Sequence, residues 1–106
     1  MIEVNYLEKN EMLECLEIKG HANYDKKGKD IVCSAVSAIG IGGLNALKST
    51  DDIDIIVGEG FIKLSGDGLK EHDNQVVIKT MLIQLLTIER SYPEFIKVLN
   101  GRKECK

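Results

Sequence analysis

A histidine and a cysteine twelve residues apart are the side chains of this sequence best suited to covalent chemistry. His21 follows a stretch typical of a strand, and Cys33 lies near the start of a stretch typical of a helix, with a polar loop between them. A thiol is a weak nucleophile until it ionises, and a helix N-terminus and a nearby imidazole both favour the thiolate. The arrangement therefore predicts a catalytic dyad, with Cys33 as the nucleophile and His21 as the group that moves the proton.

Two polar residues near the cysteine could support this chemistry. Asp30 is a good N-cap, which would place Cys33 in the first helical turn, where backbone N–H groups lack acceptors and could hold an oxyanion. Asp30 could instead orient His21 as a third catalytic member; the cap is preferred because the spacing supports it directly. Ser37 follows Cys33 by one turn on the same helix face and could hold a substrate group.

A purely structural interpretation of the same residues stays open. A lone cysteine in an apolar helix is commonly a small buried hydrophobe, and from local chemistry alone the two interpretations weigh about equally. Cys15 and Cys105 are scattered along the chain, so we expect no disulfide framework and no partner for Cys15. Because no close pair of Cys or His exists, no metal site is expected, and no cofactor is predicted. We expect His72 to be a solvated surface residue.

The composition suits one compact domain over residues 1–106, with a flexible tail at 101–106. A net charge of −3 argues against direct nucleic-acid binding and is compatible with a basic partner. No stretch approaches the roughly 18 apolar residues of a membrane span. We therefore expect a cytoplasmic protein without membrane association.

Hydrophobic periodicity indicates an α+β fold in which two long helices cover one face of a mainly antiparallel sheet of four to five strands. Glycines inside the first helix indicate that the sheet or the second helix comes close to it. The expected strands cover residues 2–7, 12–20, 53–57, 61–65 and a possible 95–99, and the expected helices cover 31–49 and 72–91.

One segment carries a family resemblance. Gly20-His21-Ala22, followed by the residues from Gly28 to Ser37, resembles the signature of the ribosomal-processing cysteine protease family, Prp. The spacing of twelve from histidine to cysteine fits the family pattern. Asn23 and Ser34 differ from the residues usual at their positions, a difference that bears on loop motion and specificity.

The resemblance implies a thiol protease that removes a short N-terminal extension from a basic large-subunit ribosomal protein, the twenty-seventh in the usual numbering. It further implies a homodimer. The alternative is a non-catalytic, ribosome-associated module for peptide binding or dimerisation. The implied site comprises His21 as base, Cys33 as nucleophile, Gly20, Asp30 and Ser37 as supporting or substrate-positioning residues, and Gly28 in a mobile loop.

Overall fold

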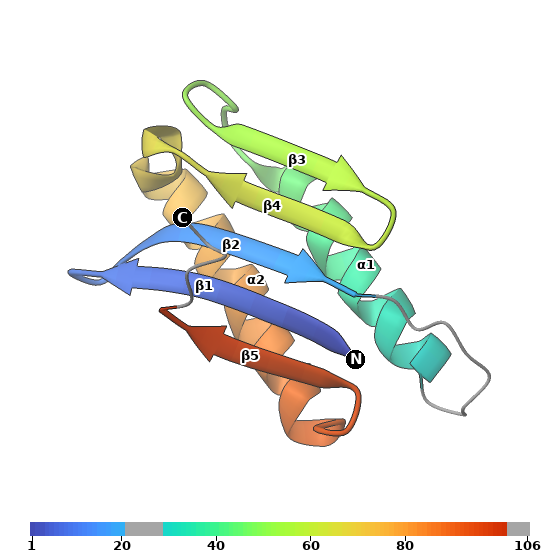
Figure 1. Cartoon of the computed structure of the whole chain (residues 1–106). Helices are drawn as coiled ribbons and strands as arrows, with labels where there is room; N and C mark the ends of the chain where they lie inside the picture. Colours follow the sequence, from blue (N-terminus) through green and yellow to red (C-terminus); the bar gives the residue numbers. More distant parts are fainter. Residues whose placement is uncertain (21–28, 102–106) are drawn as a thin grey trace.

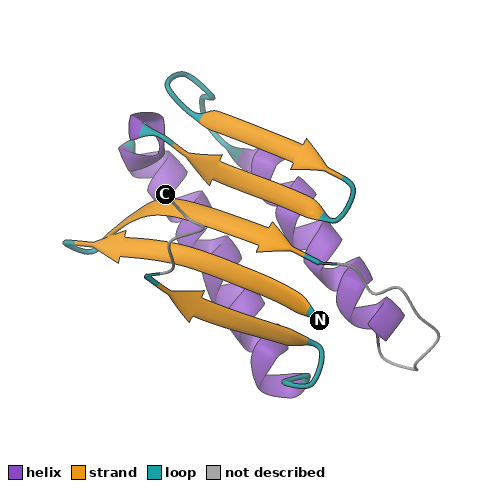
Figure 2. Ribbon diagram, viewed as in Figure 1, coloured by secondary structure: helices purple, strands orange, loops and turns teal. Residues whose placement is uncertain are grey.

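The computed structural model describes residues 1–20 and 29–101. A five-stranded sheet forms one layer, and two long helices pack on one of its faces (Figure 1 and Figure 2), as the sequence predicts. The elements in chain order are β1 (Ile2–Lys9), β2 (Met12–Lys19), α1 (Lys29–Ala46), β3 (Asp54–Gly58), β4 (Phe61–Ser65), the short 3-10 helix η1 (Asp67–Lys70), α2 (His72–Ser91) and β5 (Ile96–Asn100).

The sheet has the strand order β3-β4-β2-β1-β5, and β5 runs parallel to β1 while the other neighbours are antiparallel. The β1–β2 turn is made by Asn10 and Glu11, which have φ values of 52° and 63°. Two successive residues with positive φ match the natural twist of a hairpin. This order places β3 at one edge of the sheet and β5 at the other.

The core lies between the sheet and the helices because the strands alternate apolar and polar residues. Val4 lies opposite Ile18, and Leu16 lies opposite Leu64, so their side chains share the face that the helices cover. Each fully buried aliphatic side chain stabilises the fold by about 1.5–3 kcal/mol. The helices contribute the buried residues Val32, Val36, Ile78, Met81, Leu82 and Leu85.

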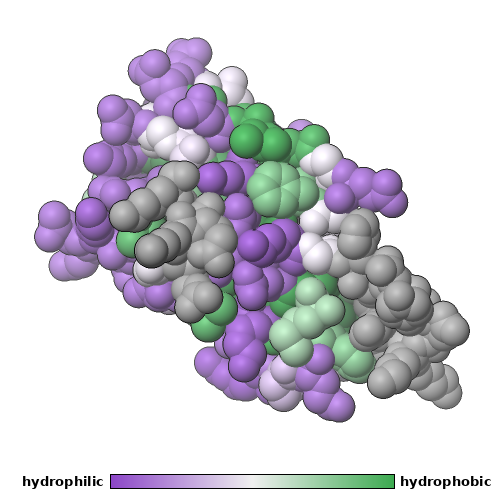
Figure 3. All heavy atoms as spheres, in the orientation of Figure 1, coloured by the Kyte–Doolittle hydropathy of each residue, from purple (hydrophilic) through white to green (hydrophobic). Residues whose placement is uncertain are grey.

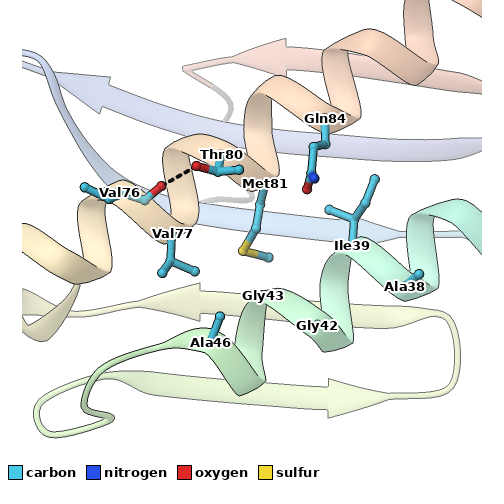
Figure 4. Close-up of a pocket in the computed structure, with 10 residues that line it drawn as sticks. All are labelled: Ala38, Ile39, Gly42, Gly43, Ala46, Val76, Val77, Thr80, Met81 and Gln84. Atoms are coloured by element: carbon cyan, nitrogen blue, oxygen red, sulfur yellow. Dashed lines mark hydrogen bonds between the residues drawn. The ribbon is translucent and has the colours of Figure 1, made fainter.

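Two of the three glycines inside α1 allow close packing, as expected. A Cβ on Gly40 would meet the side chains of Ile62 and Ile18 from the sheet, whereas a Cβ on Gly43 would meet Met81 of α2. Figure 4 shows the Met81 side chain reaching from α2 toward Gly43. Gly42 has nothing within 4 Å of such a Cβ, so the expectation does not hold there.

The boundaries of α1 differ from the predicted 31–49. The helix begins at Lys29, so Asp30 lies inside the first turn and is not the N-cap. It ends at Ala46 because the Lys48 N–H donates to Oδ1 of Asn74 (2.9 Å) on α2 instead of continuing the helix. Within the described residues, no helix is long and apolar enough to cross a membrane. Most of the predicted tail, residues 102–106, lies outside the described residues.

Candidate active site

Cys33 lines a small pocket where α1 faces the end of β2 and the β3–β4 hairpin. The side chain is half-buried and packs against the core, and the pocket has a volume of about 130 Å³. Alongside Cys33, the residues that line it are Ile2, Ile18, Gly20, Val36, Ser37, Ile41, Val57, Gly58, Gly60, Phe61 and Ile62. Cys33 is the one ionisable side chain among these residues, so the pocket wall is largely apolar.

Gly20 forms the rim of this pocket at the end of β2. Its φ is +117°, and a Cβ there would lie 2.5 Å from the Met1 carbonyl oxygen, so only glycine fits without strain. The Gly20 N–H donates to the Gly60 carbonyl oxygen at 3.0 Å. This bond ties the end of β2 to the β3–β4 turn, and Gly60 lines the same pocket.

Ser37 lines the same pocket as Cys33, one helical turn further along α1. Residues four apart on a helix are neighbours on its surface, so the hydroxyl and the thiol are presented on one face. Ser37 is exposed, and a hydroxyl can both donate and accept hydrogen bonds. The structure therefore brings together three of the predicted site residues: Gly20, Cys33 and Ser37.

Cys33 lies deeper in the helix than the sequence suggests. With the first helical residue at Lys29, Cys33 is the fifth residue of α1, and the predicted position in the first turn is wrong. The N–H groups without intrahelical acceptors belong to the turn just before it, from Lys29 to Val32. Because Cα–Cβ bonds tilt toward the helix N-terminus, the cysteine side chain still points back over that turn.

The cysteines differ in their covalent state. Cys33 is a thiol, whereas Cys15 is disulfide-bonded. The expectation that Cys15 has no partner is therefore wrong, because sequence spacing carries no information about which residues meet in space. Among the described residues, Cys33 is the cysteine outside a disulfide.

The remaining predicted site residues fall outside what the structure describes. His21 and Gly28 lie in the range 21–28, and Asp30 is described only as a helical residue. His72 does not line the pocket: its side chain is 88% exposed and lies 3.2 Å from Asp73 at the start of α2, as expected of a surface residue. Within the described part of the chain, no cluster of three or more His, Cys, Asp or Glu could hold a metal ion.

Sequence reasoning missed the contribution of the β3–β4 hairpin to the site. Four hairpin residues line the pocket although each is at least 24 residues from Cys33 in the sequence: Val57, Gly58, Gly60 and Phe61. The hairpin itself is predictable, but its place beside α1 depends on the strand order. No local signal marks these residues as part of a site.

A half-buried thiol near a helix N-terminus and beside a pocket is a suitable setting for a nucleophile, which points to the class of cysteine-dependent enzymes. The comparison with known families agrees with this class. The family model described as cysteine protease Prp matches residues 1–97, and the chain belongs to this family of cysteine proteases.

Individual relatives and solved structures support the assignment. The ribosomal processing cysteine protease Prp of Staphylococcus aureus is 32% identical over 83 residues, covering 74% of this chain and 78% of the relative. Its counterpart in Mycoplasma pneumoniae is 34% identical over 90 residues, covering 84% and 89%. The crystal structure of the S. aureus protease with a substrate peptide has a TM-score of 0.82 at 29% identity, covering 95% of this chain and 100% of that one.

Proposed function

We propose that this cysteine protease removes the short N-terminal extension of a large-subunit ribosomal protein, the twenty-seventh in the usual numbering, during ribosome maturation. The observation that carries the proposal is the Cys33 thiol at the mouth of an apolar pocket large enough for a substrate side chain. Support comes from the relatives, which are named ribosomal processing proteases, and from the similar S. aureus structure with its substrate peptide.

The proposed reaction uses Cys33 as nucleophile and His21 as acid and base. His21 accepts the thiol proton as sulfur attacks the scissile carbonyl, and then gives it to the departing amine as the peptide bond breaks. Water, deprotonated by the same imidazole, hydrolyses the thioester and frees the thiol. Gly20, which lines the pocket and directly precedes His21 in the sequence, supports this pairing.

Other residues have proposed supporting roles. Backbone N–H groups of the first turn of α1 stabilise the oxyanion, and Ser37 positions the substrate. Asp30, a residue of the first turn of α1, is a candidate to orient His21 as a third catalytic residue. Gly28 allows the segment before α1 to move as a lid over the bound peptide.

The test of the proposed function is cleavage of the purified ribosomal-protein precursor. Cys33→Ala should lower the cleavage rate by on the order of 10³-fold or more, because no other group replaces the nucleophile. Ser91→Ala is the control, since Ser91 is exposed at the end of α2 and does not line the pocket. Undiminished cleavage by Cys33→Ala would reject the mechanism, and tight precursor binding without cleavage by the wild type would favour the binding-module alternative.

A second measurement addresses the predicted partner of Cys33. Iodoacetamide should alkylate Cys33 rapidly near pH 6 in the wild type, and His21→Ala should slow that reaction at least about tenfold by removing the imidazole. Peptide mass spectrometry separates Cys33 from the other cysteines. Equal rates in the two proteins would mean that His21 does not activate the thiol.

We also propose that the enzyme is a cytoplasmic homodimer without direct contact to nucleic acid. An open apolar groove of about 430 Å³ between α1 and α2 supports dimerisation (Figure 4), and Val76 at its margin is 54% exposed. Sedimentation velocity should show a dimer for the wild type and a monomer for Val76→Glu. Thr87→Glu, on an exposed part of α2 outside the groove, is the control and should remain dimeric.

A further inference from the structure

Strand β3 forms an open edge of the sheet. Its neighbour among the described residues is β4, and every one of its five residues is exposed. In an antiparallel pair, alternate residues direct their N–H and C=O groups away from the neighbouring strand. An edge strand therefore presents a row of backbone groups that can pair with another extended chain.

This edge lacks the features by which proteins usually protect such strands. Edges are commonly blocked by lysine, proline or a β-bulge, whereas β3 contains none of these and pairs with β4 in continuous register. Its three central residues, Ile55, Ile56 and Val57, are apolar and 37–53% exposed. Figure 3 shows hydrophobic residues over the β3–β4 hairpin on the visible face of the sheet. The strand is therefore well suited to receive an added strand.

The open edge leads directly to the nucleophile. Val57 and Gly58, at the end of β3, line the Cys33 pocket. Val57 pairs with Ile62, whose side chain faces Gly40 of α1, so Val57 lies on the helix-facing side of the sheet. Ile41 of α1 lines the same pocket and is 44% exposed. An apolar trough thus runs from Cys33, between Ile41 and Val57, to the edge of the sheet.

Charge around the edge favours a basic occupant. Acidic residues lie before and after the apolar centre of β3, and residues 49–62 contain no lysine or arginine. A basic peptide would be attracted to this segment over distances of about 10 Å at moderate salt. The exposed acidic residues are Asp51, Asp52, Asp54 and Glu59.

We propose that the substrate peptide binds as an additional strand along the free edge of β3, with its apolar side chains entering the trough between Ile41 and Val57 and its scissile bond at Cys33. The inference rests on the proposed function, since the occupant is the extension of the ribosomal-protein precursor. Main-chain hydrogen bonds to β3 supply affinity, and alternate side chains of the peptide meet the trough, which sets specificity.

The first test compares two faces of the same strand. Val57→Gln places a polar group in the trough, and Ile56→Gln places the same group on the opposite face, where Ile56 has the same exposure within one per cent (53% against 52%). With a synthetic precursor peptide that spans the cleavage site, Val57→Gln should lower kcat/KM at least about tenfold, mainly through KM. Ile56→Gln should stay within about twofold of the wild type. Thermal melts establish that both variants fold.

The second test examines the backbone pairing itself. Each amide of the precursor peptide is N-methylated in turn, which removes one donor and blocks one strand-pairing position. Loss of cleavage should alternate along the peptide, because every second amide faces β3. A sensitivity confined to the residues beside the scissile bond, with no alternation, would overturn strand addition.

The outcomes separate this inference from the function on which it rests. If the wild type does not cleave the unmodified peptide, the proposed function fails and the inference fails with it. If cleavage is normal but Val57→Gln and Ile56→Gln have equal kcat/KM, only the inference is overturned. Val57→Gln could also lose activity and sediment as a monomer where the wild type sediments as a dimer. In that case β3 joins two copies of the chain, which also overturns peptide binding at this edge.

Discussion

At the scale of single residues, Gly20 is as closely specified by geometry as Cys33 is by chemistry. The backbone at Gly20 has a left-handed φ and lies against the Met1 carbonyl, while its N–H holds the β3–β4 turn through Gly60. Gly20 and Gly60 both line the pocket and are joined by this hydrogen bond. Adding a side chain at Gly20 should therefore change the shape of the pocket around Cys33. The backbone of Gly20 and the thiol of Cys33 therefore line the same pocket, and a shift of one would change its shape.

Gly20→Ala should destabilise the protein by about 1–3 kcal/mol, from the strained φ and the contact with Met1. Chemical denaturation measures this change, and the cleavage assay should show a reduced rate even where the variant is fully folded. Gly42→Ala is the control: a Cβ at Gly42 meets nothing within 4 Å, so helix propensity should stabilise that variant by about 0.5–1 kcal/mol. If Gly20→Ala were as stable as Gly42→Ala, the constraint at the rim would be absent.

At the scale of elements, the start of α2 is set by a charged cap. The Glu71 carboxylate accepts the Asn74 backbone N–H at 2.9 Å and lies 3.3 Å from the Lys48 ammonium. The bond from the Asn74 N–H lowers the pKa of Glu71, and Lys48 lowers it further. In return, the hydrogen bond to Glu71 raises the pKa of Lys48. The cap joins the region after α1 to the beginning of α2.

The cap makes stability depend on acid pH. Because the pKa of Glu71 is lower in the folded than in the unfolded protein, its contribution is complete above the unfolded value and is lost as the pH falls through the folded value. Glu71→Gln should therefore have a lower Tm than the wild type at pH 7, and the difference should shrink as both are titrated to about pH 2–3. Glu94→Gln, at an exposed position outside the cap, should change Tm little at either pH. A Glu71→Gln deficit that stays constant with pH would contradict the charged cap.

At the scale of the whole molecule, buried amides on α2 hold the layers together. The Gln75 side chain accepts the Leu13 N–H at 3.0 Å and donates to the carbonyl oxygens of Leu13 and Leu69, both at 2.8 Å. Asn74 donates to the carbonyl oxygens of Ser49 and Gly68. These bonds connect α2 to β2, to η1 and to the segment after α1. We call these hydrogen bonds of the Gln75 and Asn74 side chains the amide clamp. Because α2 packs against α1, which carries Cys33, the clamp supports the site indirectly.

Gln75→Leu should lower the free energy of unfolding by about 2–4 kcal/mol, because it leaves buried backbone groups of Leu13 and Leu69 without their side-chain partner. Urea denaturation measures the loss. Thr87→Val, which removes only an exposed bond to Ile83 on the same helix, is the control and should change stability by about 0.5 kcal/mol or less. Equal losses in the two variants would mean that the clamp does not join the layers.

Patterns along the chain are sufficient to predict the local elements and to indicate the protein family. Alternating residues predict both hairpins, and the apolar stripe predicts α2 with its observed bounds, His72 and Ser91. These features depend on neighbours along the chain, which periodicity and turn residues report directly. The spacing of His21 and Cys33 and the residues around them indicated the cysteine protease family that the comparisons confirm. The dyad itself stays a prediction.

The tertiary structure alone decided how these parts meet. The end of α1 is set by Asn74 from another helix, the disulfide bonding of Cys15 has no signal in the spacing, and the pocket is completed by Val57 and Ile41. Each depends on strand order and on packing between segments far apart in the chain, which local propensity cannot report. The open edge of β3 beside the nucleophile follows from the same packing, because a strand is an edge only by virtue of what the rest of the sheet places beside it.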